Sequence, residues 1–204
     1  MPFYFDFFAT NFRHRLKRKK CAEHGCPVKV AIGGPYCQKH IEDAMRVRID
    51  NSTIPDAGLG VFAVKSTKFP SRDGIVFKAN DIVMQYTGEL IDLNDLNRRY
   101  GKLTAPYVME LVPGKYYSDC ALERNVCSLI NHAPRKNANV ETVTHNEMDI
   151  FIVATRDIRA GEELFYDYGK SYWATNRDNS YATRYYLHGR LSSKRTEYPD
   201  LNLS

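Results

Sequence analysis

The chain has 204 residues, of which 43% are hydrophobic and 26% are charged, and its net charge at pH 7 is +5. This length allows one core of ordinary size and a small satellite module. No apolar stretch approaches the roughly 20 residues that cross a bilayer, so we expect no membrane span. The aromatic start, residues 2–8, carries an acid and no basic lead, which makes it a poor signal peptide, and we expect an intracellular protein.

Positive charge is concentrated between Arg13 and Lys20, where six of eight residues are Lys or Arg. Such a run repels itself and attracts polyanions. We therefore expect a basic N-terminal arm over residues 1–20 that supports nuclear import or contacts nucleic acid, including nucleosomal DNA. A solvated arm with no dedicated partner is an equal alternative.

Directly after the arm lie four potential metal ligands: Cys21, Cys26, Cys37 and His40. Their spacing, Cys-x4-Cys-x10-Cys-x2-His, resembles short Cys-Cys-Cys-His zinc fingers, and a segment this short would take its folding energy from the metal. We expect a structural zinc finger over residues 21–42, with His24 as an alternative to His40. Disulfides compete, but Cys120 and Cys127 make the total an odd five and nothing suggests secretion.

Short runs rich in β-branched and aromatic residues follow from about residue 47. They predict strands over residues 61–64, 82–86, 107–112, 116–118 and 150–154. Pro113-Gly114 predicts a hairpin turn between two of them. One helix is expected over residues 92–100, with Asp92 near its cap and Gly101 as its stop. The pattern indicates a mostly β or α+β fold.

Four segments carry the functional signal. They are Gly58-Leu59-Gly60, Tyr86-Thr87-Gly88-Glu89, Ser128-Leu129-Ile130-Asn131-His132, and the segment from Gly161 to Gly169. In their order and spacing they resemble the SET-domain protein lysine methyltransferases. The resemblance implies a SET domain over residues 46–170, built from small sheets with a pseudoknot. It also implies S-adenosylmethionine as the cofactor and a protein lysine as the substrate.

The resemblance also assigns individual roles. The implied cofactor contacts are Gly58, Leu59, Gly60, Asn131, His132, Tyr168, Tyr172 and Trp173. Tyr168 matches the catalytic tyrosine beside the transferred methyl group, and Tyr107 matches a tyrosine of the lysine channel. Tyr166 matches the position that sets the methylation state, and because its hydroxyl can hold a water where a second methyl needs room, we predict mainly monomethylation.

The chain departs from the family pattern in two places. Many members carry a cysteine soon after Asn-His that joins three later cysteines around a zinc ion and closes the lysine channel. Here Ala133 and Pro134 follow His132 and no cysteine follows Cys127, so we expect no such zinc and assign closure of the channel to the tail, residues 171–204. Ser128 stands where the family commonly has Arg. The motif sequences of this chain are most similar to those of the histone-monomethylating members of the family.

A basic arm, a zinc finger and a methyltransferase domain together favour a histone-tail lysine and a nuclear, chromatin location, with the cytoplasm as the alternative. A non-histone protein lysine methyltransferase is the nearest competing hypothesis. A non-catalytic chromatin or nucleic-acid binding module is the competing hypothesis from another class.

Overall fold

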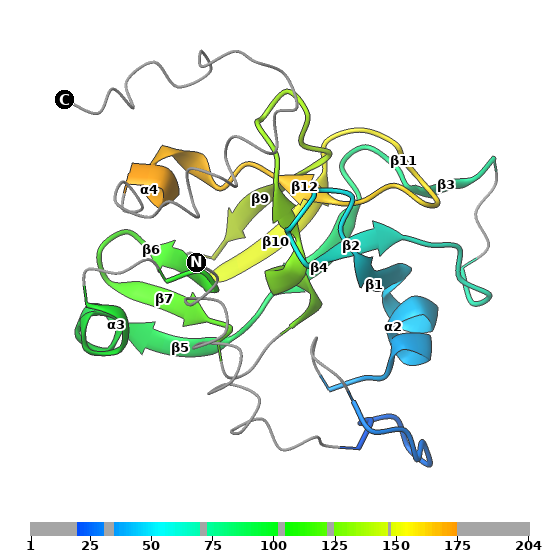
Figure 1. The fold of residues 1–204 in the computed structure, drawn as a ribbon, viewed down its shortest axis with the longest axis horizontal. Coiled ribbons are helices and arrows are strands. Elements are labelled where there is room, and N and C mark those ends of the chain that lie inside the picture. The colour runs from blue at the N-terminus through cyan, green and yellow to red at the C-terminus, as the bar shows by residue number, and fades with distance from the viewer. Residues whose placement is uncertain are drawn as a thin grey trace.

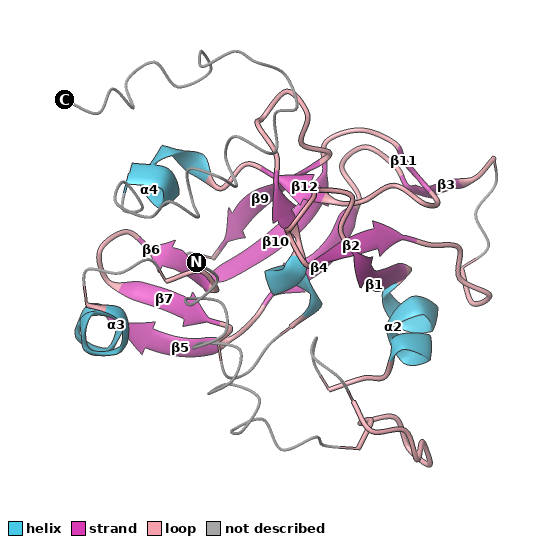
Figure 2. Ribbon diagram, in the orientation of Figure 1, coloured by secondary structure: helices cyan, strands magenta, loops and turns pink. Residues whose placement is uncertain are grey.

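The computed structural model describes residues 20–30, 35–69, 73–101, 105–121, 125–146 and 148–174. Most of the predicted basic arm and of the predicted tail lie outside these residues. Strands dominate the described part, and the helices are short (Figures 1 and 2). None of the described helices has the length and apolar character that a membrane crossing requires.

The strands are β1 (Val47–Asn51), β2 (Leu59–Ala63), β3 (Ile75–Phe77), β4 (Ile82–Tyr86), β5 (Glu89–Asp92), β6 (Val108–Val112), β7 (Tyr116–Asp119), β8 (Asn131–His132), β9 (Val140–His145), β10 (Asp149–Ala154), β11 (Ile158–Arg159) and β12 (Phe165–Tyr166). The helices are α2 (Gln38–Met45), α3 (Leu93–Tyr100) and α4 (Gly169–Ala174), with a 3-10 turn η1 (Val126–Leu129). All five predicted strands and the predicted helix are confirmed, each to within two residues.

Small sheets build the fold. The antiparallel sheets have the strand orders β1-β2, β4-β10-β9, β11-β3 and β5-β7-β6. β8 and β12 pair in parallel, although more than thirty residues separate them in the chain. This arrangement agrees with the β-rich fold expected from the sequence, while the pseudoknot crossing itself stays a prediction.

One face of the central sheet forms the core. In β10, Ile150, Ile152 and Ala154 are buried and alternate with partly exposed residues, as a strand with one covered face requires. Phe77 from β3 and Leu164, just before β12, complete the same cluster. The core therefore joins β3 and β10 with the segment that leads into β12.

Helix α3 follows from local signals. The side chain of Asp92 accepts a hydrogen bond from the Asp95 N–H (2.8 Å), which caps the first turn. Gly101 ends the helix with a φ of 58° and a ψ of −123°, a positive-φ conformation that glycine adopts more readily than other residues. The helix predicted over residues 92–100 therefore begins and ends where the sequence placed it.

Helix α2 was not predicted, and it joins the cysteine-rich segment to the core. Ile41 on α2 is buried in the core cluster, and α2 packs against β1 (Figure 1). Arg46, directly after the helix, donates a hydrogen bond to the Val76 carbonyl (2.7 Å) and stacks 4.4 Å from the Phe77 ring centroid. Helix α2, directly before residue 46, is thus packed against the sheets.

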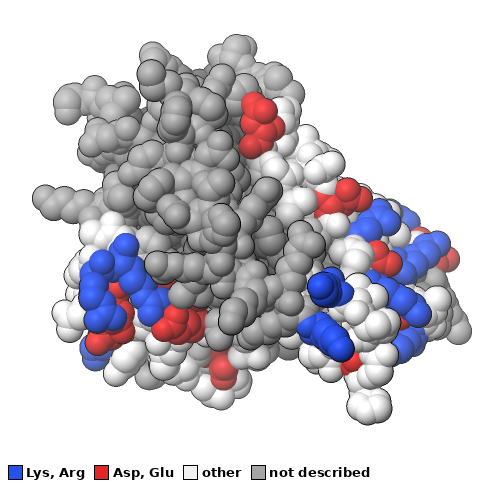
Figure 3. Space-filling model, turned by 60° about the horizontal axis from the view of Figure 1, so that its bottom comes forward, with Lys and Arg blue, Asp and Glu red and all other residues white. Residues whose placement is uncertain are grey.

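On the face shown in Figure 3, the described Lys and Arg side chains lie in two groups, with Asp and Glu side chains among them. The described residues on that face therefore carry mixed charge and do not by themselves produce a field of one sign.

Candidate functional site

Pairing of β8 with β12 assembles the centre of the site. Asn131 lies opposite Phe165 and His132 opposite Tyr166. The Ala133 N–H extends the pairing by donating to the Tyr166 carbonyl (3.2 Å). The two segments singled out in the sequence are therefore in direct contact.

Tyr168 is held at this junction by two hydrogen bonds. Its hydroxyl donates to the Ile130 carbonyl (2.7 Å), and its N–H donates to His132 Nδ1 (3.1 Å). Its ring centroid lies 4.6 Å from that of Tyr166, 4.8 Å from that of Tyr172 on α4, and 5.3 Å from that of His132. Tyr168 thus lies at the middle of an aromatic cluster, which fits a site that handles an apolar or cationic group.

His132 is neutral at physiological pH. Burial lowers the pKa of its imidazole to about 4, and the Asp167 carboxylate, 3.8 Å from Nδ1, opposes the shift only in part. Because Nδ1 accepts the Tyr168 N–H, the remaining proton of the neutral ring belongs on Nε2. The imidazole therefore orders the backbone of Tyr168 without adding charge.

Tyr166, within this aromatic cluster, and Tyr86 both have raised pKa values. Burial raises the pKa of Tyr166, and the nearby Cys127 thiol adds to the shift. Burial also raises the pKa of Tyr86, whose hydroxyl donates to the Tyr107 carbonyl (3.1 Å). That carbonyl also accepts the Cys120 N–H (2.9 Å), so the start of β6 is fixed beside the core. Tyr107 itself is half-buried against the same core.

The Gly58-Leu59-Gly60 segment, whose last two residues begin β2, lies against β8. Asn131 Nδ2 donates to the Leu59 carbonyl (3.0 Å). Gly58 has a φ of 77°, and a Cβ there would meet nothing within 4 Å, so the backbone is open on that side. Leu59 and Asn131, 72 residues apart in the chain, are thus in direct contact.

Sequence patterns did not single out the group around Glu163. This buried carboxylate accepts hydrogen bonds from Ser52 Oγ (2.7 Å), the Thr53 N–H (2.7 Å), Thr53 Oγ1 (2.5 Å) and Asn131 Nδ2 (3.1 Å). Asn139 binds on the other side, where its side chain donates to the Glu163 carbonyl (2.8 Å). No signal in the sequence separates Glu163 from its neighbour Glu162, whose partly exposed carboxylate pairs with Arg156 (2.6 Å).

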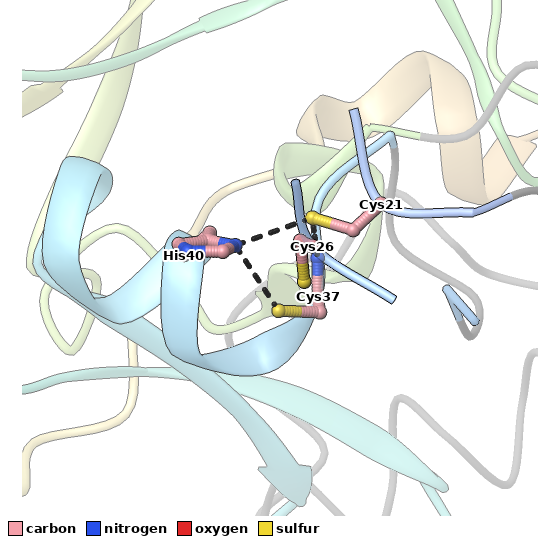
Figure 4. Close-up of side chains that lie close together, drawn as sticks. All are labelled: Cys21, Cys26, Cys37 and His40. Carbon is pink, nitrogen blue, oxygen red and sulfur yellow. Dashed lines mark hydrogen bonds between the residues drawn. The ribbon is translucent and has the colours of Figure 1, made fainter. Parts of the chain in front are cut away.

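The cysteine-rich segment brings its predicted ligands together (Figure 4). The ligand atoms of Cys21, Cys26, Cys37 and His40 all lie within 4.8 Å of one another. His40 Nδ1 is 3.2 Å from Cys21 Sγ and 3.3 Å from Cys37 Sγ. A tetrahedral zinc ion with bonds of about 2.0–2.3 Å sets such ligand atoms roughly 3.5–3.8 Å apart, so one ion could contact all four after small shifts of the side chains.

Helix α2 supplies the fourth member of this group. His40 lies in its first turn, three residues after Cys37. The Cys37 N–H donates to Cys21 Sγ (3.2 Å). Although burial opposes ionisation, this hydrogen bond, with others from Glu23 and His40, lowers the pKa of Cys21 to about 6. His24, the alternative ligand, is exposed and is not part of the described cluster.

Other predicted site residues are placed only in part. Tyr172 reaches Tyr168 from α4. Trp173 lies in the same helix, but its side chain is outside the described part of the chain. The rest of the predicted tail, from residue 175, also lies outside it, so closure of a channel by the tail stays a prediction.

Comparison with known proteins gives a consistent result. Residues 74–169 match the SET domain family model. The N-lysine methyltransferase KMT5A-A of Danio rerio is 32% identical over 140 residues, which cover 63% of this chain and 36% of that protein. The histone-lysine N-methyltransferase SUV39H1 of Xenopus laevis is 35% identical over 101 residues, which cover 45% of this chain and 24% of that protein. The chain thus spans no more than about a third of the length of these curated relatives.

Solved structures agree in fold. A chain of the Chaetomium thermophilum polycomb repressive complex 2 has a TM-score of 0.50 and 29% identity, covering 61% of this chain and 15% of that chain. A chain of ctPRC2 in an autoinhibited conformation, bound to S-adenosylmethionine, has a TM-score of 0.53 and 27% identity, covering 69% of this chain and 17% of that chain.

Proposed function

The chain carries a SET domain, and we propose that it is an S-adenosylmethionine-dependent protein lysine N-methyltransferase. The observation that carries the proposal is the placement of Tyr168, bound to Ile130 and His132 and surrounded by the rings of Tyr166 and Tyr172. Relatives named as lysine methyltransferases, one at 32% identity, support the same activity.

The residues present fit S-adenosylmethionine. The open backbone at Gly58 and the polar groups of Leu59 and Asn131 suit a charged amino-acid group. The aromatic cluster at Tyr168 suits a sulfonium, which aromatic faces attract. We assign cofactor binding to Gly58, Leu59, Gly60, Asn131, His132, Tyr168, Tyr172 and Trp173. When bound, the cofactor supplies an electrophilic methyl group.

The protein's part in the transfer is alignment and desolvation. A lysine amine attacks only when neutral, and its ordinary pKa is about 10.4. The buried Tyr86 and the partly buried Tyr166 would provide a largely apolar surrounding that disfavours the ammonium form. Tyr168, fixed by its hydrogen bond to the Ile130 carbonyl, orients the reacting groups, and Tyr107 lines the approach of the lysine side chain.

We propose that the enzyme adds mainly one methyl group. The Tyr166 ring lies 4.6 Å from the Tyr168 ring between centroids, so its phenol would lie near an amine aligned by Tyr168. A water bound to that oxygen would fill the space that a second methyl requires.

We further propose a histone-tail lysine as the substrate and the nucleus as the location. The support is indirect: SUV39H1 is named as a histone-lysine methyltransferase, and the segment from Arg13 to Lys20 suits nucleosomal DNA. A non-histone protein remains the second candidate, because KMT5A-A is named more broadly as an N-lysine methyltransferase.

A structural zinc ion completes the proposal. Cys21, Cys26, Cys37 and His40 would hold it, since three thiolates and an imidazole are a zinc ligand set and their ligand atoms all lie within 4.8 Å of one another. The ion would supply folding energy to a segment with little core of its own.

Two binding measurements distinguish the methyltransferase from a non-catalytic nucleic-acid binding module. Calorimetry measures binding of S-adenosylmethionine, and fluorescence anisotropy measures binding of bare duplex DNA. We expect saturable cofactor binding that Asn131→Ala weakens. Salt-dependent DNA binding with no cofactor binding would favour the binding module instead.

A further inference from the structure

A buried carboxylate holds the predicted cofactor surface together. Glu163 is 5% exposed, and among the described residues no Lys or Arg forms an ion pair with it. Burying an ionised carboxylate without a cation is costly unless hydrogen bonds replace its water shell. The four donors from Ser52, Thr53 and Asn131 do so here.

These donors come from distant parts of the chain. Ser52 and Thr53 precede the Gly58-Leu59-Gly60 segment by a few residues, while Asn131 lies in β8. Glu163 therefore connects Ser52 and Thr53, which shortly precede Gly58, with Asn131, which contacts Leu59. A Cβ at Gly60 would collide with Glu163 Oε1, so the carboxylate lies directly against this segment.

The same contacts fix the orientation of the Asn131 amide. Its nitrogen lies within 3.1 Å of three acceptors: Glu163 Oε1, Ser52 Oγ and the Leu59 carbonyl. A nitrogen so placed directs the amide oxygen away from the carboxylate. The Glu163 carboxylate, together with the Leu59 carbonyl and Ser52 Oγ, therefore favours this orientation of the Asn131 amide.

We propose that Glu163 is a positioning residue for the cofactor. Glu163 acts through the Asn131 amide and the Ser52–Thr53 segment. These groups present the Leu59 backbone and the Asn131 oxygen to the amino-acid part of S-adenosylmethionine. The inference rests on the proposed function. Glu163 itself does not touch the reacting atoms.

The test is Glu163→Gln, which keeps shape but replaces one acceptor oxygen by a donor. Whichever way the new amide turns, its NH2 group must face a donor, either at Thr53 or at Ser52 and Asn131. We expect the Kd for S-adenosylhomocysteine, measured by calorimetry on the full chain, to rise roughly tenfold or more. Glu162→Gln is the matched control, because Glu162 pairs with Arg156 at the surface, and it should leave the Kd unchanged.

Two readouts separate positioning from a structural role. The KM for S-adenosylmethionine should rise while kcat at saturating cofactor stays near that of the wild type. In a double-mutant cycle, Glu163→Gln combined with Asn131→Ala should cost little more than the larger single change, because both act on one unit. If Glu163→Gln fails to fold, Thr53→Val removes one donor at an exposed position and should raise the Kd about threefold.

A Kd for Glu163→Gln within twofold of the wild type would overturn the inference. So would losses that add fully to those of Asn131→Ala. A wild-type chain that binds neither S-adenosylmethionine nor S-adenosylhomocysteine would overturn the proposed function, and the inference with it.

Discussion

At the scale of single residues, Tyr166 and Tyr168 lie 4.6 Å apart between ring centroids but differ in their surroundings. The Tyr168 hydroxyl donates to the Ile130 carbonyl, whereas burial raises the pKa of the Tyr166 phenol, with the nearby Cys127 adding to the shift. The two rings can therefore serve different purposes, alignment for Tyr168 and limitation of space for Tyr166.

Replacing Tyr166 by Phe should change the product rather than abolish the reaction. Without the hydroxyl, no water is retained beside the amine, and a monomethylated lysine can bind in a reactive position. We expect a substantial dimethyl fraction, read by mass spectrometry of the modified substrate. Tyr116→Phe, at an exposed position on β7, is the control, and an unchanged product for Tyr166→Phe would refute the role given to Tyr166.

His132 should make the fold sensitive to acid. The native pKa of His132, about 4, lies below the ordinary 6.5. Between pH 4 and pH 6.5 the imidazole is therefore protonated in the unfolded chain but neutral in the native protein. Stability from this group is complete above pH 6.5 and is lost as pH falls toward 4, by roughly 3 kcal/mol at most.

Urea unfolding followed by circular dichroism at pH 7, 5.5 and 4.5 measures this loss. His132→Gln, which can still accept the Tyr168 N–H, should show a flatter dependence than the wild type. His145→Gln, at an exposed position on β9, should behave like the wild type. Parallel curves for the wild type and His132→Gln would contradict the assignment.

At the scale of elements, α2 couples the cysteine cluster to the core. The helix begins after Cys37, carries His40 in its first turn and buries Ile41 in the core. A bound metal ion would therefore order the helix that packs against β1, and β1 pairs with the strand that begins at Leu59.

Removal of zinc should therefore destabilise more than the finger. We expect a chelator to lower the Tm of the whole chain by roughly 5 °C or more, with recovery on addition of zinc. Cys37→Ala should lower the Tm similarly and no longer respond to the chelator. His24→Ala is the matched control for a nearby exposed residue, and a chelator response lost in that variant would instead favour His24 as the ligand.

How far the sequence predicts the elements depends on their contacts. The strands found in advance, such as 82–86 and 150–154, are apolar runs whose burial is encoded locally. β8, β11 and β12 have two residues each and exist only because a distant partner binds them, so no local pattern marks them. α2 was missed because its eight residues bury only Ile41.

The candidate site also contains residues that the sequence predicts and residues that it does not. Asn131, His132 and Tyr168 meet as the motif resemblance implied, because each lies in a segment whose type and order are informative. Glu163 was not found because its partners Ser52 and Thr53 lie about 110 residues away. Which of two adjacent glutamates turns inward is decided by the pairing of residue 163 with Phe62 and not by any local pattern.

At the scale of the whole molecule, we propose that the SET unit extends over residues 46–170, beyond the matched residues 74–169. The Leu164 N–H donates to the Val61 carbonyl (2.7 Å), and the Gly161 N–H donates to the Ala63 carbonyl (2.8 Å). The β1-β2 hairpin is thereby bound to the C-terminal end of the domain. A chain beginning at residue 74 would lack this hairpin and leave Leu164 uncovered on one side.

The basic arm should act on association and not on chemistry. Replacing the six Lys and Arg residues between Arg13 and Lys20 by Gln should weaken binding to nucleosomal DNA and reduce the slope of log Kd against log salt, by up to about 5. Transfer to a free substrate peptide should be unchanged. A salt slope unaffected by the substitution, measured by fluorescence anisotropy, would leave the arm with no role in DNA binding.

The most direct test of the central claim is methyl transfer from labelled S-adenosylmethionine to recombinant nucleosomes and free core histones, with the wild type and Tyr168→Phe compared by mass spectrometry. We predict a lysine product that carries mainly one methyl group with the wild type and a loss of at least about a hundredfold in rate with Tyr168→Phe. Transfer to other proteins but not to histones would redirect the substrate. No transfer to any protein lysine by a chain that binds the cofactor would contradict the account.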